Sequence, residues 1–261
     1  MLRLTQKTLN EMAKKCSQKI LNGKVDFDYF EMPFKHLVID DFFDVALAKT
    51  CLREFPRLND SIWEQANDAD IEVKYRTKWN SEFDIPEGIV DAVRLLNSAP
   101  LLKAVAERFA IPKLIPDPYF SGGGLNVTAT GGLLDVHVDG NYHDATGLNR
   151  RMNAIVYLNP NWQPGWGGEF GLYDATGRVC LKEVAPLFNR LVIFDSHDKS
   201  FHGLPAPLLF PEGETRKSII LYWYTKDSRP SEQVVVENPH SALWVKRNLK
   251  DKRGNKTRDF S

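Results

Sequence analysis

The sequence predicts a mainly β protein, in which an antiparallel sandwich or barrel such as a jelly roll carries a layer of helices on one face. Two features support this fold class. Apolar residues recur at helical spacing in several parts of the first 117 residues, whereas short apolar runs separated by glycine, asparagine and proline clusters extend from residue 118 to about residue 225. Because the helical regions precede the strands, we expect one β core with helices packed against it.

The length of 261 residues fits a single domain with a substantial core, since β sandwiches and barrels of this size often form one domain. Within residues 1–261 we distinguish three segments. Residues 1–117 are expected to form a supporting layer of helices and strands, residues 118–226 the β core, and residues 227–261 a C-terminal extension.

Three regions of the supporting layer have helical character. Apolar spacing predicts an amphipathic helix over residues 6–21, and Asp44 is placed to cap a second helix that Pro56 ends. The pattern of residues 86–109 predicts two more helices, with Ser98 as the cap of the second. A short strand is expected at residues 36–40.

The polar stretch of residues 59–84 is interpreted as loops. It contains four aromatic residues, Trp63, Tyr75, Trp79 and Phe83. Packing of these rings beneath a long loop is the favoured interpretation, and a loop-rich surface near a cleft is the alternative.

Seven short strands are expected in the β core. They span residues 125–129, 133–138, 153–158, 170–173, 179–183, 190–194 and 218–224. Beyond them, residues 241–249 have a helical pattern. The basic run at residues 250–258 is interpreted as a solvated terminus without a function.

The charge balance argues against a polyanionic partner. The 34 Lys and Arg residues equal the 34 Asp and Glu residues, so no global field favours nucleic acid or an acidic membrane. No apolar run is long enough to span a bilayer. The three cysteines, Cys16, Cys51 and Cys180, are widely separated and form no CxxC pair, which favours a reducing, cytoplasmic location.

The candidate chemistry begins at His137 and Asp139. Side chains alternate along a strand, so residues two apart share a face, and a histidine from a distant strand could complete a set of metal ligands. Two imidazoles and one carboxylate on one face of an octahedral iron leave three positions open, as in non-haem Fe(II) oxygenases. We favour His202 over His197 as the third ligand, because His202 precedes a glycine and is better placed relative to Arg216. His143 is interpreted as a solvated loop residue, and a substrate contact is the alternative.

Arg216 and Ser218 are candidates for binding a carboxylate. They also lie two residues apart, at the start of an apolar aromatic strand, so they share a face. A guanidinium forms two parallel hydrogen bonds with a carboxylate, and each charge-assisted bond contributes roughly 1.5–3 kcal/mol. The pair therefore suits a small dicarboxylic acid.

Six motifs in this order give the chain a family resemblance. They lie at residues 136–139, 153–159, 166–170, 190–195, 202–203 and 216–218. Together they resemble the Fe(II)- and 2-oxoglutarate-dependent dioxygenases, and most closely the prolyl 4-hydroxylase-like branch. The resemblance covers roughly residues 118–226.

The resemblance implies a double-stranded β-helix, a variant of the jelly roll, with Fe(II) held by His137, Asp139 and His202. Arg216 would pair with the far carboxylate of the co-substrate 2-oxoglutarate, with help from Ser218. Dioxygen would be the second co-substrate, and the resemblance also allows ascorbate as a cofactor.

One expected side chain does not stand where many members have it. On the strand before the HxD motif, those members carry a tyrosine that contacts 2-oxoglutarate, whereas this chain carries polar residues there. We expect Asn126 or Thr128, or else Thr130, to supply that hydrogen bond.

The expected activity is hydroxylation of an unactivated C–H bond, with 2-oxoglutarate converted to succinate and carbon dioxide. The substrate is left open between a free amino acid, a peptidyl residue such as proline, and a small metabolite, and so is the oligomeric state. The alternative function is a non-catalytic jelly-roll protein that binds a metal or a sugar. Two further features are left open: Trp166 as lid or core residue, and residues 204–215 as a cover of the site or a surface loop.

Overall fold

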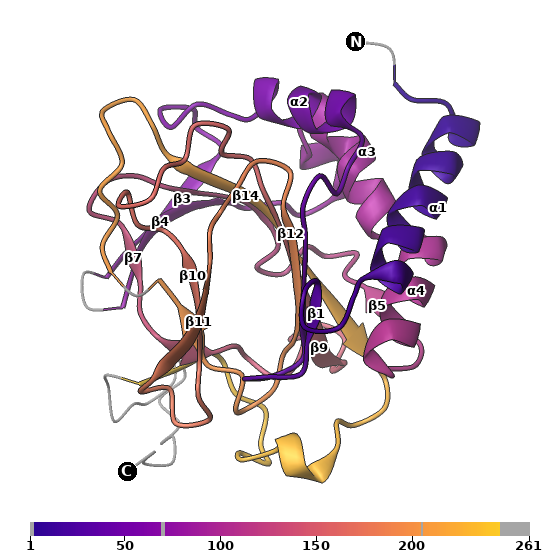
Figure 1. The fold of residues 1–261 in the computed structure, drawn as a ribbon, viewed down its shortest axis with the longest axis vertical. Helices are drawn as coiled ribbons and strands as arrows, with labels where there is room; N and C mark the ends of the chain where they lie inside the picture. Colours follow the sequence, from indigo (N-terminus) through magenta and orange to yellow (C-terminus); the bar gives the residue numbers. More distant parts are fainter. Residues whose placement is uncertain (1–2, 69–70, 205, 246–261) are drawn as a thin grey trace.

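Two antiparallel sheets face each other, and helices cover the outer face of the larger one (Figure 1). This is a computed structural model, which describes residues 3–68, 71–204 and 206–245. The order of strands is β1-β2-β12-β9-β14-β6-β4-β3 in the larger sheet and β11-β10-β13-β8-β15 in the smaller one. The predicted class, a mainly β double-stranded β-helix with a layer of N-terminal helices, is confirmed.

The helices are α1 (Gln6–Asn22), α2 (Val45–Arg53), α3 (Glu87–Leu96) and α4 (Ala99–Phe109), with 3-10 turns η1 (Glu82–Asp84) and η2 (Ser231–Gln233). The larger sheet contains β1 (Tyr29–Phe30), β2 (His36–Ile39), β3 (Trp63–Asp68), β4 (Glu72–Thr77), β5 (Ile115–Pro116), β6 (Gly124–Thr128), β7 (Leu133–Leu134), β9 (Asn149–Tyr157), β12 (Leu191–Asp195) and β14 (Arg216–Thr225). The smaller sheet contains β8 (His137–Val138), β10 (Phe170–Tyr173), β11 (Cys180–Val184), β13 (His202–Gly203) and β15 (Leu243–Trp244). Within the described ranges, no helix combines the length and hydropathy needed to cross a membrane.

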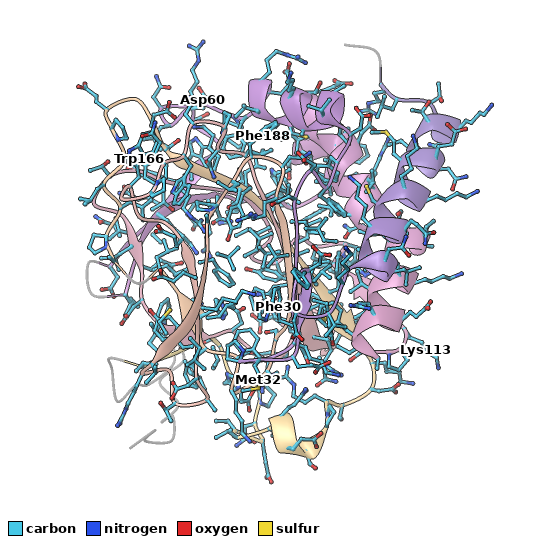
Figure 2. The ribbon with its side chains drawn as sticks, viewed as in Figure 1. Phe30, Met32, Asp60, Lys113, Trp166 and Phe188 are labelled. Atoms are coloured by element: carbon cyan, nitrogen blue, oxygen red, sulfur yellow. The ribbon has the colours of Figure 1, made fainter. Side chains whose placement is uncertain are left out.

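The central strands of the larger sheet are buried on both faces. On β9, Val156 packs into the cluster shared with the helices, whereas Ile155 and Tyr157 pack into a second cluster between the two sheets. Side chains fill the space between the sheets (Figure 2). Any functional side chain on the inner face is therefore held between two packed layers.

The helical layer follows the predicted pattern closely. The side chain of Asp44 caps α2 by accepting a hydrogen bond from the backbone N–H of Ala46. Ser98 occupies the N-cap position of α4, but its side chain makes no capping hydrogen bond. The apolar periodicity therefore located the helices, whereas the chemistry of one cap differs from the expectation.

The prediction of loops over residues 59–84 is wrong in part. Strands β3 and β4 form an antiparallel hairpin, and β4 pairs with β6 at the edge of the larger sheet. Its residues are polar because one face of β4 meets a polar cavity instead of an apolar core. Of the aromatic residues in this stretch, Trp79 is buried as the favoured interpretation required, whereas Phe83 is 88% exposed.

Two further differences concern the smaller sheet. The predicted strand at residues 133–138 is split into β7 and β8, which pair with different sheets. The helix predicted at residues 241–249 is wrong where it is described, because Leu243 and Trp244 pair with β8 as β15. The remainder of that helix and the basic run at residues 250–258 lie outside the described residues.

Candidate active site

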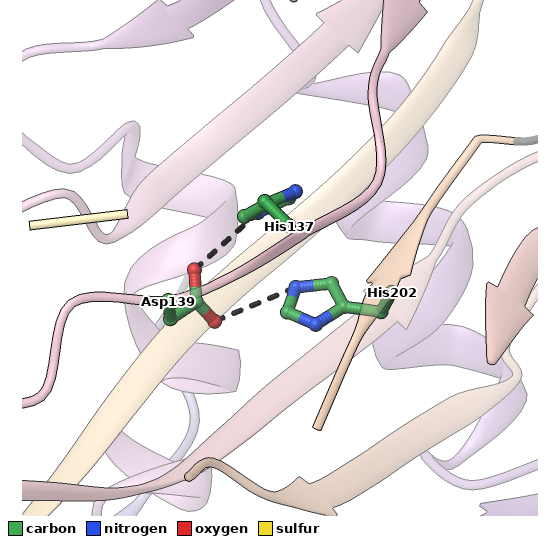
Figure 3. Close-up of side chains that lie close together, drawn as sticks. All are labelled: His137, Asp139 and His202. Carbon is green, nitrogen blue, oxygen red and sulfur yellow. Dashed lines mark ion pairs between the residues drawn. The ribbon is translucent and has the colours of Figure 1, made fainter. Parts of the chain in front are cut away.

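Three potential metal ligands meet beside the paired strands β8 and β13. His137 and His202 are directly paired across these strands, and Asp139 follows β8 immediately. The Nε2 atoms of His137 and His202 lie 3.6 and 3.5 Å from the two carboxylate oxygens of Asp139 (Figure 3). If one potential ligand atom is taken from each residue, the three atoms all lie within 4.8 Å of one another.

Hydrogen bonds fix the orientation of both imidazole rings. Nδ1 of His137 lies 2.8 Å from the carbonyl oxygen of Asp135, and Nδ1 of His202 lies 2.9 Å from that of Ser200. Since a carbonyl only accepts, each Nδ1 carries the proton, and each Nε2 presents its lone pair to the centre of the group. This donor set fits a divalent metal, because bonds of about 2.0–2.2 Å from nitrogen and oxygen can span such separations.

The charge of Asp139 is supported by its neighbours. Asn153 donates a hydrogen bond to the carboxylate from Nδ2, and Nη1 of Arg150 lies 3.9 Å from it. Burial favours the neutral acid, but His202, His137 and Arg150 outweigh burial and hold the pKa of Asp139 below its usual range. Burial also lowers the pKa of His202 to about 4. The resting site therefore holds an ionised carboxylate and a neutral His202, the protonation states that bind metals.

An aromatic ring that sequence reasoning missed packs against the candidate ligand His137. Trp244, on β15, faces His137 with ring centroids 4.5 Å apart and planes at 31°. Its position depends on pairing between β15 and β8, which the helical pattern of residues 241–249 concealed.

A second polar group lies on the inner face of the larger sheet. The buried guanidinium of Arg216 donates to the carbonyl of Gly168 at 2.7 Å and to the hydroxyl of Tyr157 at 3.1 Å. Ser218 is opposite Tyr157 on one neighbouring strand and opposite Asn126 on the other. Directly opposite residues share a face, so these side chains form one polar group.

The register also locates the other predicted contacts of 2-oxoglutarate. Thr128 is opposite Arg216 and is buried, and Asn126 lines the cavity beside the metal ligands. Tyr157 is an addition that sequence reasoning missed. The available signal was its spacing, since Tyr157 and Asn153 share one face of β9.

A cavity of about 640 Å³ opens beside His137 and Asp139. Its walls combine charged groups from the β3–β4 hairpin with aromatic rings from β14 and β15. Among them are Glu72, Lys74, Arg76, Tyr222, Tyr224 and Trp244. None of the described residues between 204 and 215 lines this cavity.

His143 and His197 lie outside the ligand group. His143 is buried, which corrects its interpretation as a solvated residue. Its Nδ1 accepts hydrogen bonds from the backbone N–H groups of Ala145 and Thr146, so its Nε2 donates to Asp117 at 2.9 Å. Nδ1 of His197 accepts from the backbone of Lys199. Each ring thus orders a turn.

Trp166 and the segment that follows His202 pack together. The ring of Trp166 contacts that of Phe210 at a centroid distance of 5.3 Å, in a cluster with buried Leu204 and Leu208. Backbone hydrogen bonds join Leu208 to Gly131 and Gly132. The described part of this segment, residues 204 and 206–215, is therefore a packed connection, and Trp166 belongs to its core.

Comparisons with known proteins agree with this geometry. Residues 123–225 match the family model described as the 2OG-Fe(II) oxygenase superfamily. The chain is 32% identical over 106 residues to the prolyl 3-hydroxylase OGFOD1 of Mus musculus, a match that covers 38% of this chain and 19% of the relative. The matched region thus spans about a fifth of that protein.

Solved structures show the same fold. A prolyl hydroxylase from Trichoplax adhaerens, in complex with a hypoxia inducible factor peptide fragment, has a TM-score of 0.55 at 17% identity and covers 85% of this chain and 94% of its own. A prolyl-4-hydroxylase from Pseudomonas putida has a TM-score of 0.54 at 18% identity and covers 83% and 100%.

Proposed function

We propose that this chain, whose residues 123–225 match the family model of the 2OG-Fe(II) oxygenase superfamily, is a 2-oxoglutarate-dependent hydroxylase whose iron is held by His137, Asp139 and His202. The overall reaction inserts one oxygen atom of O2 into a substrate C–H bond. The other oxygen atom enters succinate as 2-oxoglutarate loses carbon dioxide. Ascorbate is included only as an accessory reductant.

The observation that carries the proposal is the arrangement of the three ligand atoms. Both histidines direct an unprotonated Nε2 at the carboxylate of Asp139, and all three donors belong to one buried group. Iron bound there by one face would supply O2 activation at its remaining positions. The complete ligand set does not favour the alternative, a non-catalytic binding protein.

Arg216, Tyr157 and Ser218 would bind the far carboxylate of 2-oxoglutarate. Arg216 supplies the positive charge, and Gly168 and Tyr157 fix its orientation. Burial raises the pKa of Tyr157, so its hydroxyl keeps a proton. Because this oxygen accepts from Arg216, its own proton remains available to a carboxylate. Asn126 and Thr128 are assigned auxiliary contacts from β6.

Peptidyl proline is the first substrate to test. The mouse relative is named a prolyl 3-hydroxylase, and the Trichoplax prolyl hydroxylase holds a peptide fragment. The mixed charged and aromatic walls of the cavity suit a polar substrate, so a free amino acid or small metabolite is the next class. We include no nucleic-acid partner in the proposal.

We also propose a reducing, cytoplasmic setting. Cys16, Cys51 and Cys180 are all free thiols in the structure, and the first two are buried. A reducing compartment keeps such thiols and an Fe(II) site in the required state.

The decisive experiment measures succinate formed from 2-oxoglutarate by the full chain with Fe(II) and O2. His137→Ala should abolish the iron-dependent product, whereas His197→Gln, which changes a histidine outside the ligand group, should retain it. Equal turnover in His137→Ala would rule out the proposed site. A screen of peptides and metabolites for a gain of one oxygen mass would then identify the substrate.

A further inference from the structure

After the larger sheet, the chain returns to the strands of the smaller sheet that carry the candidate metal ligands. After β14 ends at Thr225, residues 229–244 run through η2 and finish as β15 beside β8. We call residues 229–244 the strap. It lies outside the region 123–225 that matches the family model, so the match assigns it no role.

Asp198 ties the strap to the turn that precedes His202. This residue is 0% exposed, and its two oxygens accept four hydrogen bonds from the strap. Nε2 of His240 and Nη1 of Arg229 donate to Oδ1 at 3.2 and 3.3 Å, and the backbone N–H groups of Val235 and Val236 donate to Oδ2 at 2.8 and 3.0 Å. Every acceptor position of the carboxylate is thus used by one segment.

The strap also contacts the segment just after Asp139. Asn141 accepts from the backbone N–H of His240 at 2.9 Å, and its own backbone N–H donates to the carbonyl of His240 at 3.1 Å. Gly140 permits this close approach, since a Cβ there would lie 2.9 Å from the carbonyl oxygen of His240. A larger residue at position 140 would push the backbone of the strap away.

The end of the strap reaches His137. Leu243 is buried against Val138 and Phe201, and this packing seats Trp244 on the ring of His137. The strap therefore contacts the chain next to all three candidate metal ligands. His137 and Asp139 belong to one segment, and His202 lies 63 residues after Asp139.

We propose that the strap is an integral part of the metal centre and that Asp198 is a positioning residue, which holds the strap so that the three ligands keep their spacing. This inference rests on the proposed function, because it assumes that the three residues bind a metal. Partners beyond the ligands typically change metal affinity by roughly 10–100-fold. Loss of the Asp198 anchor should have an effect of that size.

The test titrates the full chain with Co(II), a visible stand-in for Fe(II), and follows both the cobalt absorption bands and tryptophan fluorescence. Asp198→Asn should weaken Co(II) binding roughly 10–100-fold and alter the cobalt bands. The matched control is Asp84→Asn. Asp84 also accepts two backbone N–H bonds, from Asn80 and Ser81, but it lies in η1 and does not line the cavity. The Co(II) affinity and the cobalt absorption bands of Asp84→Asn should remain those of the unmodified chain.

Trp244→Phe tests whether Trp244 lies next to the bound metal without removing the aromatic packing against His137. This variant keeps an aromatic ring against His137, so it should retain Co(II) affinity while losing most of the metal-dependent fluorescence quenching. Quenching equal to that of the unmodified chain would contradict the seating of Trp244 at the metal.

The possible outcomes distinguish a failure of the proposed function from a failure of the inference about the strap. If the unmodified chain binds no Co(II), the proposed function fails and the inference fails with it. If the unmodified chain binds Co(II) and a folded Asp198→Asn protein binds it equally well with the same bands, only the inference is overturned. Should Asp198→Asn not fold, Gly140→Ala decides, because its added Cβ displaces the strap at His240 while the Asp198 side chain itself is unchanged. Unchanged Co(II) binding by Gly140→Ala would overturn the inference.

Discussion

Ser218 has a buried hydroxyl for which the described residues provide no hydrogen-bond partner. Burying an unpaired polar group is unfavourable, so such a group in a functional face suggests a missing ligand. Across the strands it faces Tyr157 and Asn126, beside the buried guanidinium of Arg216. The proposed 2-oxoglutarate carboxylate would supply the acceptor.

Ser218→Ala should therefore have opposite effects on folding and binding. Without ligand, the free energy of unfolding should stay the same or rise by up to about 1 kcal/mol, because an unpaired hydroxyl has been removed. The KM for 2-oxoglutarate should rise by roughly 10-fold or more, since a hydrogen bond to a charged group contributes about 1.5–3 kcal/mol. Urea unfolding and succinate kinetics check the two effects. A clear loss of stability with an unchanged KM would contradict this role.

Tyr157→Phe should weaken both properties. Arg216 loses a hydrogen-bond acceptor in the free protein, so unfolding should become easier by about 1–3 kcal/mol. The orientation of the guanidinium and one donor to the carboxylate are lost together, so the KM for 2-oxoglutarate should rise by roughly 10-fold or more. The same two measurements apply, and a KM equal to that of the unmodified chain would remove Tyr157 from the binding site.

His36 provides a test of pH dependence away from the metal ligands. It is 0% exposed, and burial lowers its pKa to about 4, below an unfolded value of about 6.5. Between these values the unfolded chain binds a proton that the folded chain excludes. Its contribution to stability is therefore complete above about pH 6.5 and is lost as the pH falls toward 4.

Metal-free protein should accordingly lose stability between about pH 6.5 and pH 4, with His36 contributing on the order of 3 kcal/mol. His36→Phe keeps a ring beside Phe30 but cannot titrate, so its stability should fall less over this range. Urea unfolding at several pH values measures the difference. Parallel curves for the two proteins would assign the pH dependence to other groups.

Among the elements, the predictable ones were those with a repeating apolar pattern. Strand β10 has the predicted bounds, and β9, β12 and β14 lie within a few residues of theirs, because their side chains are buried on one or both faces. The β3–β4 hairpin has no such pattern, since its exposed and half-buried residues are held by pairing with β6. Local sequence carries little information about such edge strands.

The candidate site was predictable where chemistry and spacing coincide. The HxD motif predicts two candidate ligands on one face, and the structure brings His202 from a distant strand next to them. The places of Trp244 and Tyr157 in the site depend on which strands become neighbours, and these pairings join residues more than 60 positions apart. The spacing of Tyr157 from Asn153 indicates a shared face of β9 but not the strand that lies beside it. The site residues that the sequence did not identify are those whose position depends on strand register rather than on residue type.

Asn189 joins two elements that lie far apart in the chain. Its side chain accepts from the backbone N–H of Phe43 and donates to the Phe43 carbonyl, both at 2.9 Å, while its own backbone has a φ of 61°. Asn189→Ala leaves a buried N–H and a buried carbonyl unpaired in a left-handed conformation that alanine adopts poorly. We expect a loss of about 2–4 kcal/mol in unfolding free energy by urea denaturation. A loss below about 0.5 kcal/mol, the usual range of surface changes, would show that this link contributes little.

For the whole molecule, the important division is between the two sheets. The candidate metal ligands belong to the smaller sheet or to the residue that follows it, whereas Arg216, Tyr157 and Ser218 belong to the larger sheet. Asn153 bridges the two by donating from β9 to Asp139. A 2-oxoglutarate molecule that reaches from the metal to Arg216 would join the sheets in the same way.

Metal and 2-oxoglutarate should therefore stabilise the fold together. Saturation with metal to 100 times its dissociation constant should add about 2.7 kcal/mol to the unfolding free energy, because the unfolded chain lacks the preformed site. Addition of 2-oxoglutarate should produce a larger increase with metal present than without it, because only the metal-bound protein anchors both ends of the molecule. Thermal unfolding with Co(II), 2-oxoglutarate and both together measures these increments.

Two variants assign the increments to the two sheets. His137→Ala should lose the shift produced by Co(II), whereas Arg216→Ala should retain that shift and lose the additional one produced by 2-oxoglutarate. A chelator should reverse both shifts in the unmodified chain. Equal stabilisation by 2-oxoglutarate with and without metal would contradict this prediction. In that case 2-oxoglutarate does not bind the metal and the larger sheet together, and the anion site on the larger sheet works independently of the metal centre.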